Sequence, residues 1–579
     1  MKPARRRWEV RDAVPLDGMH PVLGHLLAAR GHDAASAASL ISGSCDSHDP
    51  HLLRGMTEAV IAIGVAVADG SGIAVYGDYD ADGVTACAML TRALRAGGAR
   101  VIPYIPHRVN EGYGLHAAAL EDLARQGIEC VITVDCGTSS IEVARSRPCG
   151  MKLIVTDHHL PLAPDGTPPA LAPADALVNP KQPGCAYPFD GLAGAGVALK
   201  LVEALEGEAV VPPGSVEGSL GLAALGTVCD MMPLRGENRS IVSRGLKQLR
   251  KLPGLDALCR LAGTKSELVA SDLAFTVGPR INAAGRMEDA VLALNLCLSD
   301  DEEGAVGLAS RLDDQNRERR AALANALEGA YERVAELPED MPAIVVGDPG
   351  WPVGIVGLIA GRLAERYARP AFVVCLDGDE AKGSARSVPG VHIVRALDGA
   401  ASTLIRYGGH VAAAGFSLQP SRFAEFSNQI CAAVAAQVEG LPRERVFAID
   451  ALVRPSDISL DLCEALRSLE PCGQGNPSPL LAVEDCTVLS TSPFGVDGRH
   501  LRITLGGSDG LMEAVAFDKP QLASHLPRGR RIDICCGLEM DEWEGQTRVR
   551  ARLRDLRPSR ASRPLVLAQE DRLPVAVSA

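Results

Sequence analysis

Residues 75–86 read VYGDYDADGVTA, and the interpretation of the whole chain starts from them. The apolar residues 72–76 predict a buried strand, and the residues from Gly83 onward predict a helix. Asp78, Asp80 and Asp82 therefore lie where a strand passes into a helix. Side chains at alternate positions of an extended segment point the same way, and three like charges aimed at one point repel unless a cation lies between them. The stretch predicts a divalent cation held by oxygen ligands; the alternative is a solvated acidic turn that caps the helix.

Further polar clusters follow other predicted strands. Strand-like runs at residues 73–76, 101–104, 130–134 and 153–156 alternate with helical stretches, which predicts a parallel sheet covered by helices. Asp135 follows the third run, and Asp157, His158 and His159 follow the fourth. Because ligand sites of such sheets lie beyond the carboxyl ends of the strands, we expect these side chains to converge with the first three acids.

A fourth cluster ends at Asp230. This residue closes an apolar helical stretch and precedes Pro233. It is either a further carboxylate of the same cavity or a polar break before the proline, and the local sequence does not separate these readings.

Composition narrows the class of protein. The chain has 579 residues, of which 47% are hydrophobic and 22% charged, as expected for a soluble globular protein of several domains. The apolar run 59–68 is about half the ~20 residues of a membrane span, and no secretory signal is visible, so we expect a cytoplasmic protein without a membrane partner. The 16 cysteines show no CxxC pair and predict reduced core residues. The net charge of −14 argues at first against nucleic acid, but a local basic track can be hidden within an acidic total.

These acids and histidines, in this order, resemble the DHH phosphoesterase superfamily. The runs 106–115 (PHRVNEGYGL), 278–286 (GPRINAAGR) and 408–410 (GGH) look like the RecJ-type single-strand-specific exonucleases of bacteria. The resemblance extends from about residue 20 to residue 560. By itself, Gly408-Gly409-His410 is also compatible with an ordinary turn.

The pattern and the resemblance together predict an α/β fold with a small barrel. A parallel-sheet DHH domain is joined by a long helix to a second α/β DHH-associated domain, and a small β-barrel of the OB-fold type follows. The helix is amphipathic with charged residues between its apolar positions, and the alternative is a long surface helix of the first domain. The expected parts are an N-terminal segment with short helices (1–50), the DHH catalytic domain (51–300), the connecting helix (301–336), the DHH-associated substrate-binding domain (337–440), the OB-fold nucleic-acid-binding domain (441–560) and a disordered tail (561–579).

The resemblance implies roles for the clustered side chains. Asp135 would bridge two divalent cations, Mn²⁺ or Mg²⁺, and His159 would contact the scissile phosphate. The expected metal ligands are Asp78, Asp80, Asp82, Asp135, His158 and Asp230, with Asp78 either in the ligand set or just behind it.

The same resemblance implies a binding site for the 5′ end of a DNA strand. Arg108, Ser384 and Arg386 would hold a terminal 5′ phosphate. Tyr113, Arg280, Asn282 and His410 would make further substrate contacts. In the barrel, four arginines alternate with apolar residues: Arg548, Arg550, Arg552 and Arg554. One face of this strand would present their guanidinium groups to a phosphate backbone. The alternative is that the arginines only make an exposed strand soluble.

The leading expectation is therefore a metal-dependent exonuclease that degrades single-stranded DNA from 5′ to 3′ and releases 5′ mononucleotides in DNA repair and recombination. The alternatives are a DHH-type phosphodiesterase acting on short oligonucleotides or cyclic dinucleotides, and a non-catalytic scaffold that binds single strands. The barrel favours a polymer substrate, and the intact acids argue against a dead enzyme. We expect a monomer that cooperates with a helicase and a single-strand-binding protein.

Overall fold

A computed structural model describes residues 1–43, 47–108, 110–161, 169–440, 443–507, 509–543 and 546–559. These residues form two compact units. One contains residues 42–320 and 469–477, and the other contains residues 1–41, 321–468 and the chain from 478. The tail 561–579, expected to be disordered, lies outside the described residues.

The unit that begins at residue 42 is built on a parallel sheet. Its strand order is β3-β2-β4-β5-β6, and every neighbouring pair is parallel. The expected parallel sheet is therefore confirmed. The strands are β2 (Gly72–Tyr76), β3 (Val101–Tyr104), β4 (Ile128–Thr133), β5 (Lys152–Thr156) and β6 (Ala176–Val178).

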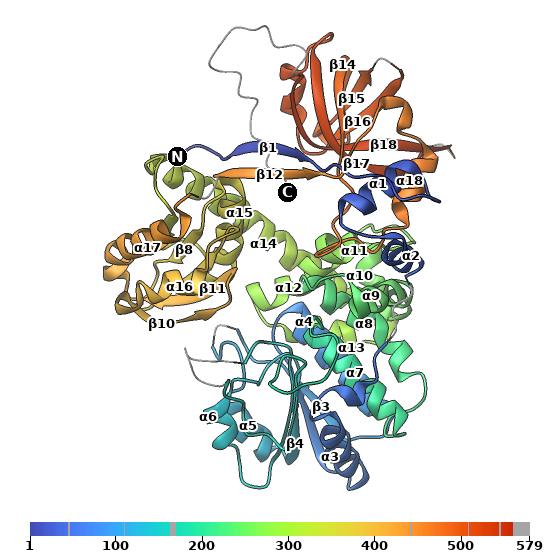
Figure 1. Cartoon of the computed structure of the whole chain (residues 1–579). Helices are drawn as coiled ribbons and strands as arrows, with labels where there is room; N and C mark the ends of the chain where they lie inside the picture. Colours follow the sequence, from blue (N-terminus) through green and yellow to red (C-terminus); the bar gives the residue numbers. More distant parts are fainter. Residues whose placement is uncertain are drawn as a thin grey trace. The chain divides into compact units, whose positions relative to one another are not determined.

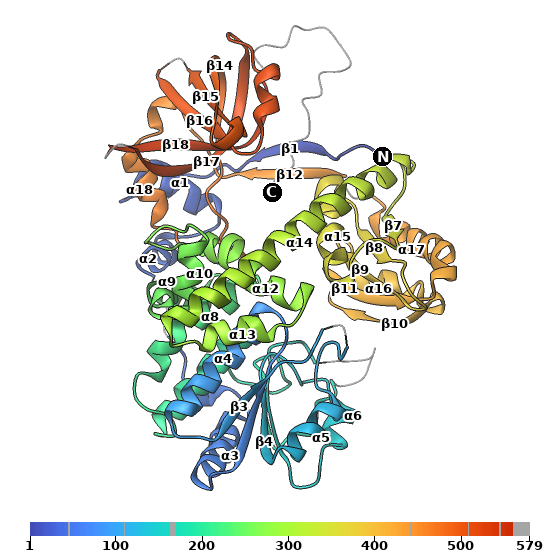
Figure 2. The same ribbon diagram turned by 180° about the vertical axis from the view of Figure 1, so that it is seen from behind.

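Every residue of β2 is buried, because the sheet has a core on each side. Ile73 and Val75 belong to one core, and Ala74 and Tyr76 belong to the other. This follows from the two-residue period of a strand whose faces are both covered. Figures 1 and 2 show α3 (Met56–Ala68) on one side of the sheet and α5 (Ala117–Arg125) and α6 (Ile141–Arg145) on the other.

A largely helical part follows the sheet in the same unit. Here α4 (Ala81–Ala96), which comes directly after β2, packs against two helices that arrive much later, α7 and α8. That packing brings residues near 194 and 230 toward the end of β2. The helices after the sheet are α7 (Gly194–Gly207), α8 (Ser215–Cys229), α9 (Gly236–Gln248), α10 (Pro253–Leu261), α11 (Ala270–Asp272), α12 (Gly278–Met287) and α13 (Val291–Leu298).

The long helix α14 (Glu302–Glu336) contributes residues to both units. A second α/β sheet then follows in the order β10-β11-β9-β8-β7, in which only β7 and β8 are parallel. Its helices are α15 (Val356–Tyr367), α16 (Ile393–Asp398) and α17 (Phe423–Val438). Its strands are β7 (Ile344–Asp348), β8 (Ala371–Cys375), β9 (Ala381–Arg386), β10 (Leu404–Gly409) and β11 (Ala413–Leu418).

The expected barrel is confirmed. The pairings β14-β15-β16-β18-β17 are completed by pairing of β17 with β14, which closes a five-stranded barrel. Closure removes the open edges that a flat sheet would expose. The strands are β14 (Leu481–Phe494), β15 (His500–Gly506), β16 (Leu511–Ala516), β17 (Arg531–Trp543) and β18 (Gln546–Pro558), and the two-residue β13 (Ala451–Leu452) and the short α18 (Leu460–Arg467) precede them.

The N-terminal segment differs from its expectation. Two helices are present, α1 (Pro21–Ala29) and α2 (Ala34–Ser42), but a strand, β1 (Arg5–Val10), comes before them. It pairs in parallel with β12 (Glu444–Ile449). The sequence of β1 is rich in arginine and has only two apolar residues, Trp8 and Val10, so its strand character depends on a partner more than 400 residues away.

Candidate metal centre

The three acids after β2 converge, but not in the way that the sequence predicted. Asp80 is the N-cap of α4, and its carboxylate accepts hydrogen bonds from the amides of Asp82 (2.9 Å) and Gly83 (3.1 Å). Asp82 therefore lies in the first helical turn and not in an extended segment, so the expected strand alternation of the three side chains is wrong. N-capping and metal binding, posed above as alternatives, use the same loop.

Asp82 points to a second helix. Its two carboxylate oxygens accept hydrogen bonds from the amides of Gly194 (2.7 Å) and Ala195 (2.9 Å), at the start of α7. Free amides at a helix N-terminus favour a negative charge. This interaction holds a buried carboxylate in place although it is surrounded by other acids.

The later polar clusters meet these acids as expected from the parallel sheet. Nε2 of His158 lies 3.2 Å from Oδ1 of Asp135, 3.5 Å from Oδ2 of Asp230 and 3.9 Å from Oδ2 of Asp82. Asp230 is the C-cap of α8, and because its carboxylate also lies beside His158 it is more than a polar break before Pro233. Residues from β2, β4, β5 and α8 thus reach one place.

The donor atoms form three overlapping groups, within each of which one atom per residue lies within 4.8 Å of the others. Asp135 belongs to two of them and His158 to two. This sharing is the arrangement that two neighbouring ions would require, with one carboxylate between them. The groups are Asp78-Asp80-Asp135, Asp82-His158-Asp230 and Asp135-His158-His159.

The electrostatics of the cluster favour a bound cation. Burial raises the pKa of Asp82 and of Asp135 well above the usual range, and the neighbouring carboxylates raise both further. Burial and then Asp80 raise the pKa of Asp230 to about 7. Burial, with help from His159 and Lys181, lowers the pKa of His158 to about 3, so its imidazole is neutral and able to ligate.

Two further observations fit ions at this place. Oδ1 of Asp78 and Oδ1 of Asp135 are buried and make no hydrogen bond to any residue that the structure describes. A Cβ atom at Gly194 would lie 2.5 Å from Oδ1 of Asp135, and one at Gly226 would lie 2.6 Å from Oδ1 of Asp82. The carboxylates therefore keep unused acceptor capacity, and glycine is required where the helices pass them. Two of the three groups are rich in carboxylates, with no imidazole in one and a single imidazole in the other, and such oxygen-rich donors suit Mn²⁺ or Mg²⁺.

His159 has different surroundings from His158. Its Nδ1 lies 2.8 Å from Oδ1 of Asp157 and 3.1 Å from the hydroxyl of Tyr113. Burial alone would lower the pKa of His159, but the hydrogen bond and charge of Asp157 outweigh it and the pKa is raised. Asp157 itself accepts hydrogen bonds from the backbone amides of Thr138, His158 and His159, which holds the backbone that carries both histidines.

The other predicted residues of this unit are held by specific contacts. Arg108 lies over the ring of Tyr79, with its guanidinium carbon 4.8 Å from the ring centre. Arg280 donates to Asp313 (2.9 Å), so its charge is already paired. Asn282 accepts a hydrogen bond from the amide of Ala81 (2.9 Å) and so supports the acidic loop.

Ser384, Arg386 and His410 lie in the other unit. Nη1 of Arg386 donates to Oγ of Ser384 (2.9 Å), and both residues are on β9. A Cβ at Gly357, in the first turn of α15, would lie 3.1 Å from each of the two side chains. His410 is exposed between β10 and β11, where its amide donates to the carbonyl of Ala413 (2.8 Å).

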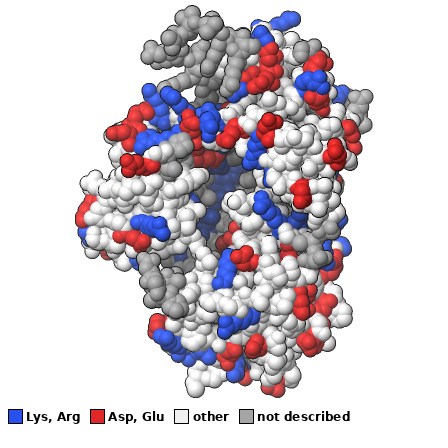
Figure 3. All heavy atoms as spheres, viewed as in Figure 1, with Lys and Arg blue, Asp and Glu red and all other residues white. Residues whose placement is uncertain are grey.

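The barrel arginines alternate with buried residues on β18, as expected. Ala551 and Leu553 are buried, and Arg548 and Arg554 are exposed. Arg550 and Arg552, however, already pair with Asp541 and Glu539 of β17. Figure 3 likewise shows basic and acidic side chains interspersed over the face in view, without one large surface of a single sign.

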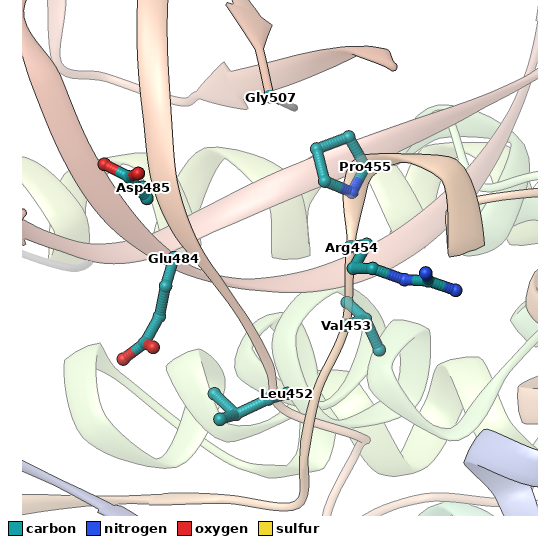
Figure 4. Close-up of a pocket in the computed structure, with 7 residues that line it drawn as sticks. All are labelled: Leu452, Val453, Arg454, Pro455, Glu484, Asp485 and Gly507. Atoms are coloured by element: carbon teal, nitrogen blue, oxygen red, sulfur yellow. The ribbon is translucent and has the colours of Figure 1, made fainter. Parts of the chain in front are cut away.

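A cavity of about 260 Å³ lies beside the barrel, lined by Leu452, Val453, Arg454, Pro455, Glu484, Asp485 and Gly507 (Figure 4). Its charged side chains are paired: Glu484 with Arg557, Asp485 with Arg531, and Arg454 with Asp457. Figure 4 shows Arg454 pointing away from the two acids. None of the residues that line this cavity has a buried polar atom without a hydrogen bond, in contrast to Asp78 and Asp135 of the acidic cluster.

Lys181 and Asn179 were missed from the sequence. Burial lowers the pKa of Lys181, and Asp230 is the acid that opposes this most. Asn179 donates to Oγ1 of Thr138 (2.9 Å) and to the carbonyl of His159 (2.8 Å). Their only signal was their place directly after β6, where a parallel sheet presents its ligands.

Comparison with known proteins agrees with this geometry. Residues 72–227 match the N-terminal domain of the DHH family, residues 340–436 match the DHHA1 domain, and residues 449–555 match the RecJ OB domain. No helix among the described residues is both long enough and apolar enough to cross a membrane.

Named relatives cover almost the whole chain. The single-stranded-DNA-specific exonuclease RecJ of Bacillus subtilis is 34% identical over 96% of this chain and 71% of its own length. The protein of the same name from Dickeya dadantii is 34% identical over 96% of this chain and 99% of its own length. The crystal structure of RecJ in complex with Mn²⁺ from Thermus thermophilus superimposes with a TM-score of 0.80 at 30% identity, covering 97% of this chain and 80% of that one. The chain therefore belongs to the RecJ family of DHH-domain proteins.

Proposed function

We propose that this chain is a metal-dependent exonuclease that hydrolyses single-stranded DNA from the 5′ end and releases 5′ mononucleotides in DNA repair and recombination. The observation that carries the proposal is the sharing of Asp135 and His158 between overlapping groups of donor atoms. The names of the relatives supply the substrate class. The direction of degradation comes from the end-binding residues considered below.

The acids and His158 would hold two Mn²⁺ or Mg²⁺ ions, with Asp135 between them. When bound, such ions lower the pKa of a water molecule and offset the charge on a phosphate. The relevant contribution of the protein is to keep six donors close together against their mutual repulsion. The amides of Gly194 and Ala195 do so for Asp82, and the helix-capping amides do so for Asp80.

His159 would assist the leaving oxygen. Its raised pKa keeps a proton available, and Asp157 fixes the ring through Nδ1. Nε2 is then the atom that can donate a proton to the oxygen that leaves phosphorus. The two adjacent histidines thus take different roles, because the pKa of one is lowered and that of the other is raised.

Arg108, Ser384 and Arg386 would bind the terminal 5′ phosphate. Support comes from the bond between Arg386 and Ser384 and from their position against the first turn of α15, since helix N-termini favour phosphate groups. A pocket for a free 5′ phosphate would explain degradation from the 5′ end. Tyr113, Arg280, Asn282 and His410 would contact the substrate or hold the loops that do, and the arginines of β18 would follow the strand. We further propose that the chain acts as a cytoplasmic monomer with a helicase and a single-strand-binding protein.

A time course on end-labelled DNA tests the function. The full chain is incubated with a single strand and with its blunt duplex, in Mn²⁺, in Mg²⁺ and then in chelator. We expect mononucleotide release from the single strand, from the 5′ end only, and none in chelator. Cleavage of a cyclic dinucleotide but not of the strand would support a phosphodiesterase instead, and binding without cleavage in either metal would support a scaffold.

A further inference from the structure

The loop of residues 105–114 follows β3 and leads toward α5, and the structure describes it except for Val109. It carries two of the predicted substrate residues, Arg108 and Tyr113. None of its described residues belongs to the three groups of metal donors. The conformation of this loop therefore decides where those two side chains lie with respect to the acidic cluster.

Glu111 closes the loop through both oxygens of its carboxylate. Oε1 accepts a hydrogen bond from the hydroxyl of Tyr104 (2.8 Å), at the end of β3, and Oε2 accepts one from the amide of His107 (2.7 Å). In return, the amides of Glu111 (2.9 Å) and Gly112 (3.2 Å) donate to the carbonyl of His107. Arg108 thus follows a residue whose amide and carbonyl are both held by the opposite side of the loop.

The far end of the loop is held by a second tyrosine. The hydroxyl of Tyr76, at the end of β2, donates to the carbonyl of Gly114 (3.0 Å). The rings of Tyr76 and Tyr104 are stacked, with their centres 4.9 Å apart and their planes at 23°. Burial raises the pKa of Tyr104, and the hydrogen bond to Glu111 raises it further, so this hydroxyl keeps its proton and acts as the donor. Two stacked tyrosines of neighbouring strands therefore fix both ends of the loop.

The closed loop brings its two predicted substrate residues to the metal centre. Arg108 lies over the ring of Tyr79, which belongs to the acidic loop after β2, with its guanidinium carbon 4.8 Å from the ring centre. The hydroxyl of Tyr113 donates to the carbonyl of Asp135 (3.3 Å). The contacts of Glu111 are thus separated from the acids by one residue that carries a positive charge and one that carries a hydroxyl.

We propose that Glu111 is a positioning residue for the reaction: by closing the loop onto Tyr104, it sets where Arg108 lies over Tyr79. A carboxylate suits this role because both of its partners are donors, whereas an amide would turn a donor of its own toward one of them. The role of Arg108 as a ligand of the terminal 5′ phosphate rests on the proposed function. The closing of the loop by Glu111 does not.

The test compares the full-length wild type with Glu111→Gln and Tyr104→Phe, which disturb one hydrogen bond from its two sides. The control is Tyr187→Phe, because the hydroxyl of Tyr187 donates to Glu237 (2.6 Å) in the same unit but outside the loop. Steady-state kinetics in Mn²⁺ are measured on a short single strand with a 5′ phosphate and on the same strand with a 5′ hydroxyl. We expect KM for the phosphorylated strand to rise roughly 10-fold in both loop variants, the scale of one hydrogen bond to a charged group. The value of kcat and the KM for the hydroxyl strand should change little, and the control should keep the wild-type ratio of the two KM values.

Hydrogen–deuterium exchange of the loop 105–114, in chelator and without DNA, tests the closure by itself. Faster exchange in both loop variants but not in Tyr187→Phe is the expected result, and unchanged exchange would overturn the proposal. A preference for the phosphorylated strand that survives in both variants, or an equal loss on both strands, would overturn it as well. Should Glu111→Gln fail to fold, Tyr104→Phe decides the comparison, because it leaves the bond from Glu111 to His107 in place.

The wild type separates this proposal from the proposed function. Absence of cleavage by the wild type would refute the function, and absence of a preference for a 5′ phosphate would refute the role of Arg108. In either case the exchange measurement still decides whether Glu111 holds the loop.

Discussion

Nε2 of His158 lies 3.2 Å from Oδ1 of Asp135, although the two residues follow different strands of the parallel sheet. The contact makes no hydrogen bond of its own, and Oδ1 of Asp135 is left without one among the residues described. A nitrogen and an oxygen that lie this close without a hydrogen bond between them are positioned to coordinate the same metal ion. The predictions below follow from that relationship.

Asp135→Asn should abolish cleavage and leave the fold intact. Asp135 has φ = 62°, a left-handed conformation that asparagine tolerates, so this change adds no backbone strain. Loss of the charge between the two groups should lower kcat by about 100- to 1,000-fold in Mn²⁺, the order expected for a residue central to charge stabilisation. The readout is a single-turnover rate on a 5′-labelled strand, with circular dichroism to check folding. The exposed Asp122→Asn serves as the control, and near-normal turnover in Asp135→Asn would remove this residue from the site.

Gly194→Ala should disturb the cluster without contacting substrate. The added Cβ would lie 2.5 Å from Oδ1 of Asp135. We expect weaker Mn²⁺ binding by at least 10-fold and lower thermal stability. Gly207→Ala, at the other end of the same helix, has nothing within 4 Å of the added atom and should stabilise the chain by about 0.5–1 kcal/mol. Equal Mn²⁺ affinity in the two variants would contradict the requirement for glycine at position 194 beside Asp135.

The protein in chelator should become less stable as pH rises. The folded chain holds protons on acids whose pKa is raised, and Asp230 titrates near 7 instead of 3.8. Because the unfolded chain has lost these protons by pH 5, the contribution is present at low pH and decreases as pH rises through about 7. Each pH unit over which one such group differs is worth about 1.4 kcal/mol.

Thermal unfolding between pH 5 and pH 8 measures this effect. Saturating Mn²⁺ should reverse the trend, since a cation replaces the protons and binds better when they are absent. Asp230→Asn in chelator should show a flatter profile than the wild type. A wild-type profile that is already flat in chelator would show that the acids are not protonated in the folded chain.

Arg386→Met should impair the recognition of a strand end. The guanidinium donates to Ser384 beside the first turn of α15. We expect KM for a 5′-phosphorylated strand to rise about 10-fold or more, and the advantage of that strand over a 5′-hydroxyl strand to disappear. Arg422→Met, at a half-buried arginine of the same domain that pairs with Glu425, is the matched control. An equal loss on both kinds of strand end would argue against an end-binding pocket.

The sequence predicted the convergence of the site but not its internal geometry. Acids that follow β2, β4 and β5 were expected at one sheet edge, because parallel strands end on the same side. The position of Asp80 as an N-cap was not decided, because capping and ligation use the same residue types. The interaction of Asp82 with the start of α7 could not be predicted, since it depends on how α4 packs against a helix that begins 112 residues after Asp82.

The fold was predictable where the pattern was local. Alternating strands and helices gave the parallel sheet, and evenly spaced short strands gave the barrel. The strand β1 was missed, because RRRWEV has only two apolar residues and is stabilised by a partner in the second half of the chain. The pairing of Arg550 and Arg552 with acids of β17 was missed for the same reason, since it requires the register of two barrel strands.

The pairing of β1 with β12 has a consequence for biosynthesis. Arg5 leaves the ribosome long before Glu444, its partner in the register, has been translated. The segment at the start of the nascent polypeptide therefore remains unpaired and basic while both α/β domains are synthesised. A chaperone or any polyanion that captures those arginines early would delay completion of the barrel unit, so the order of synthesis and the order of assembly are opposed in this molecule.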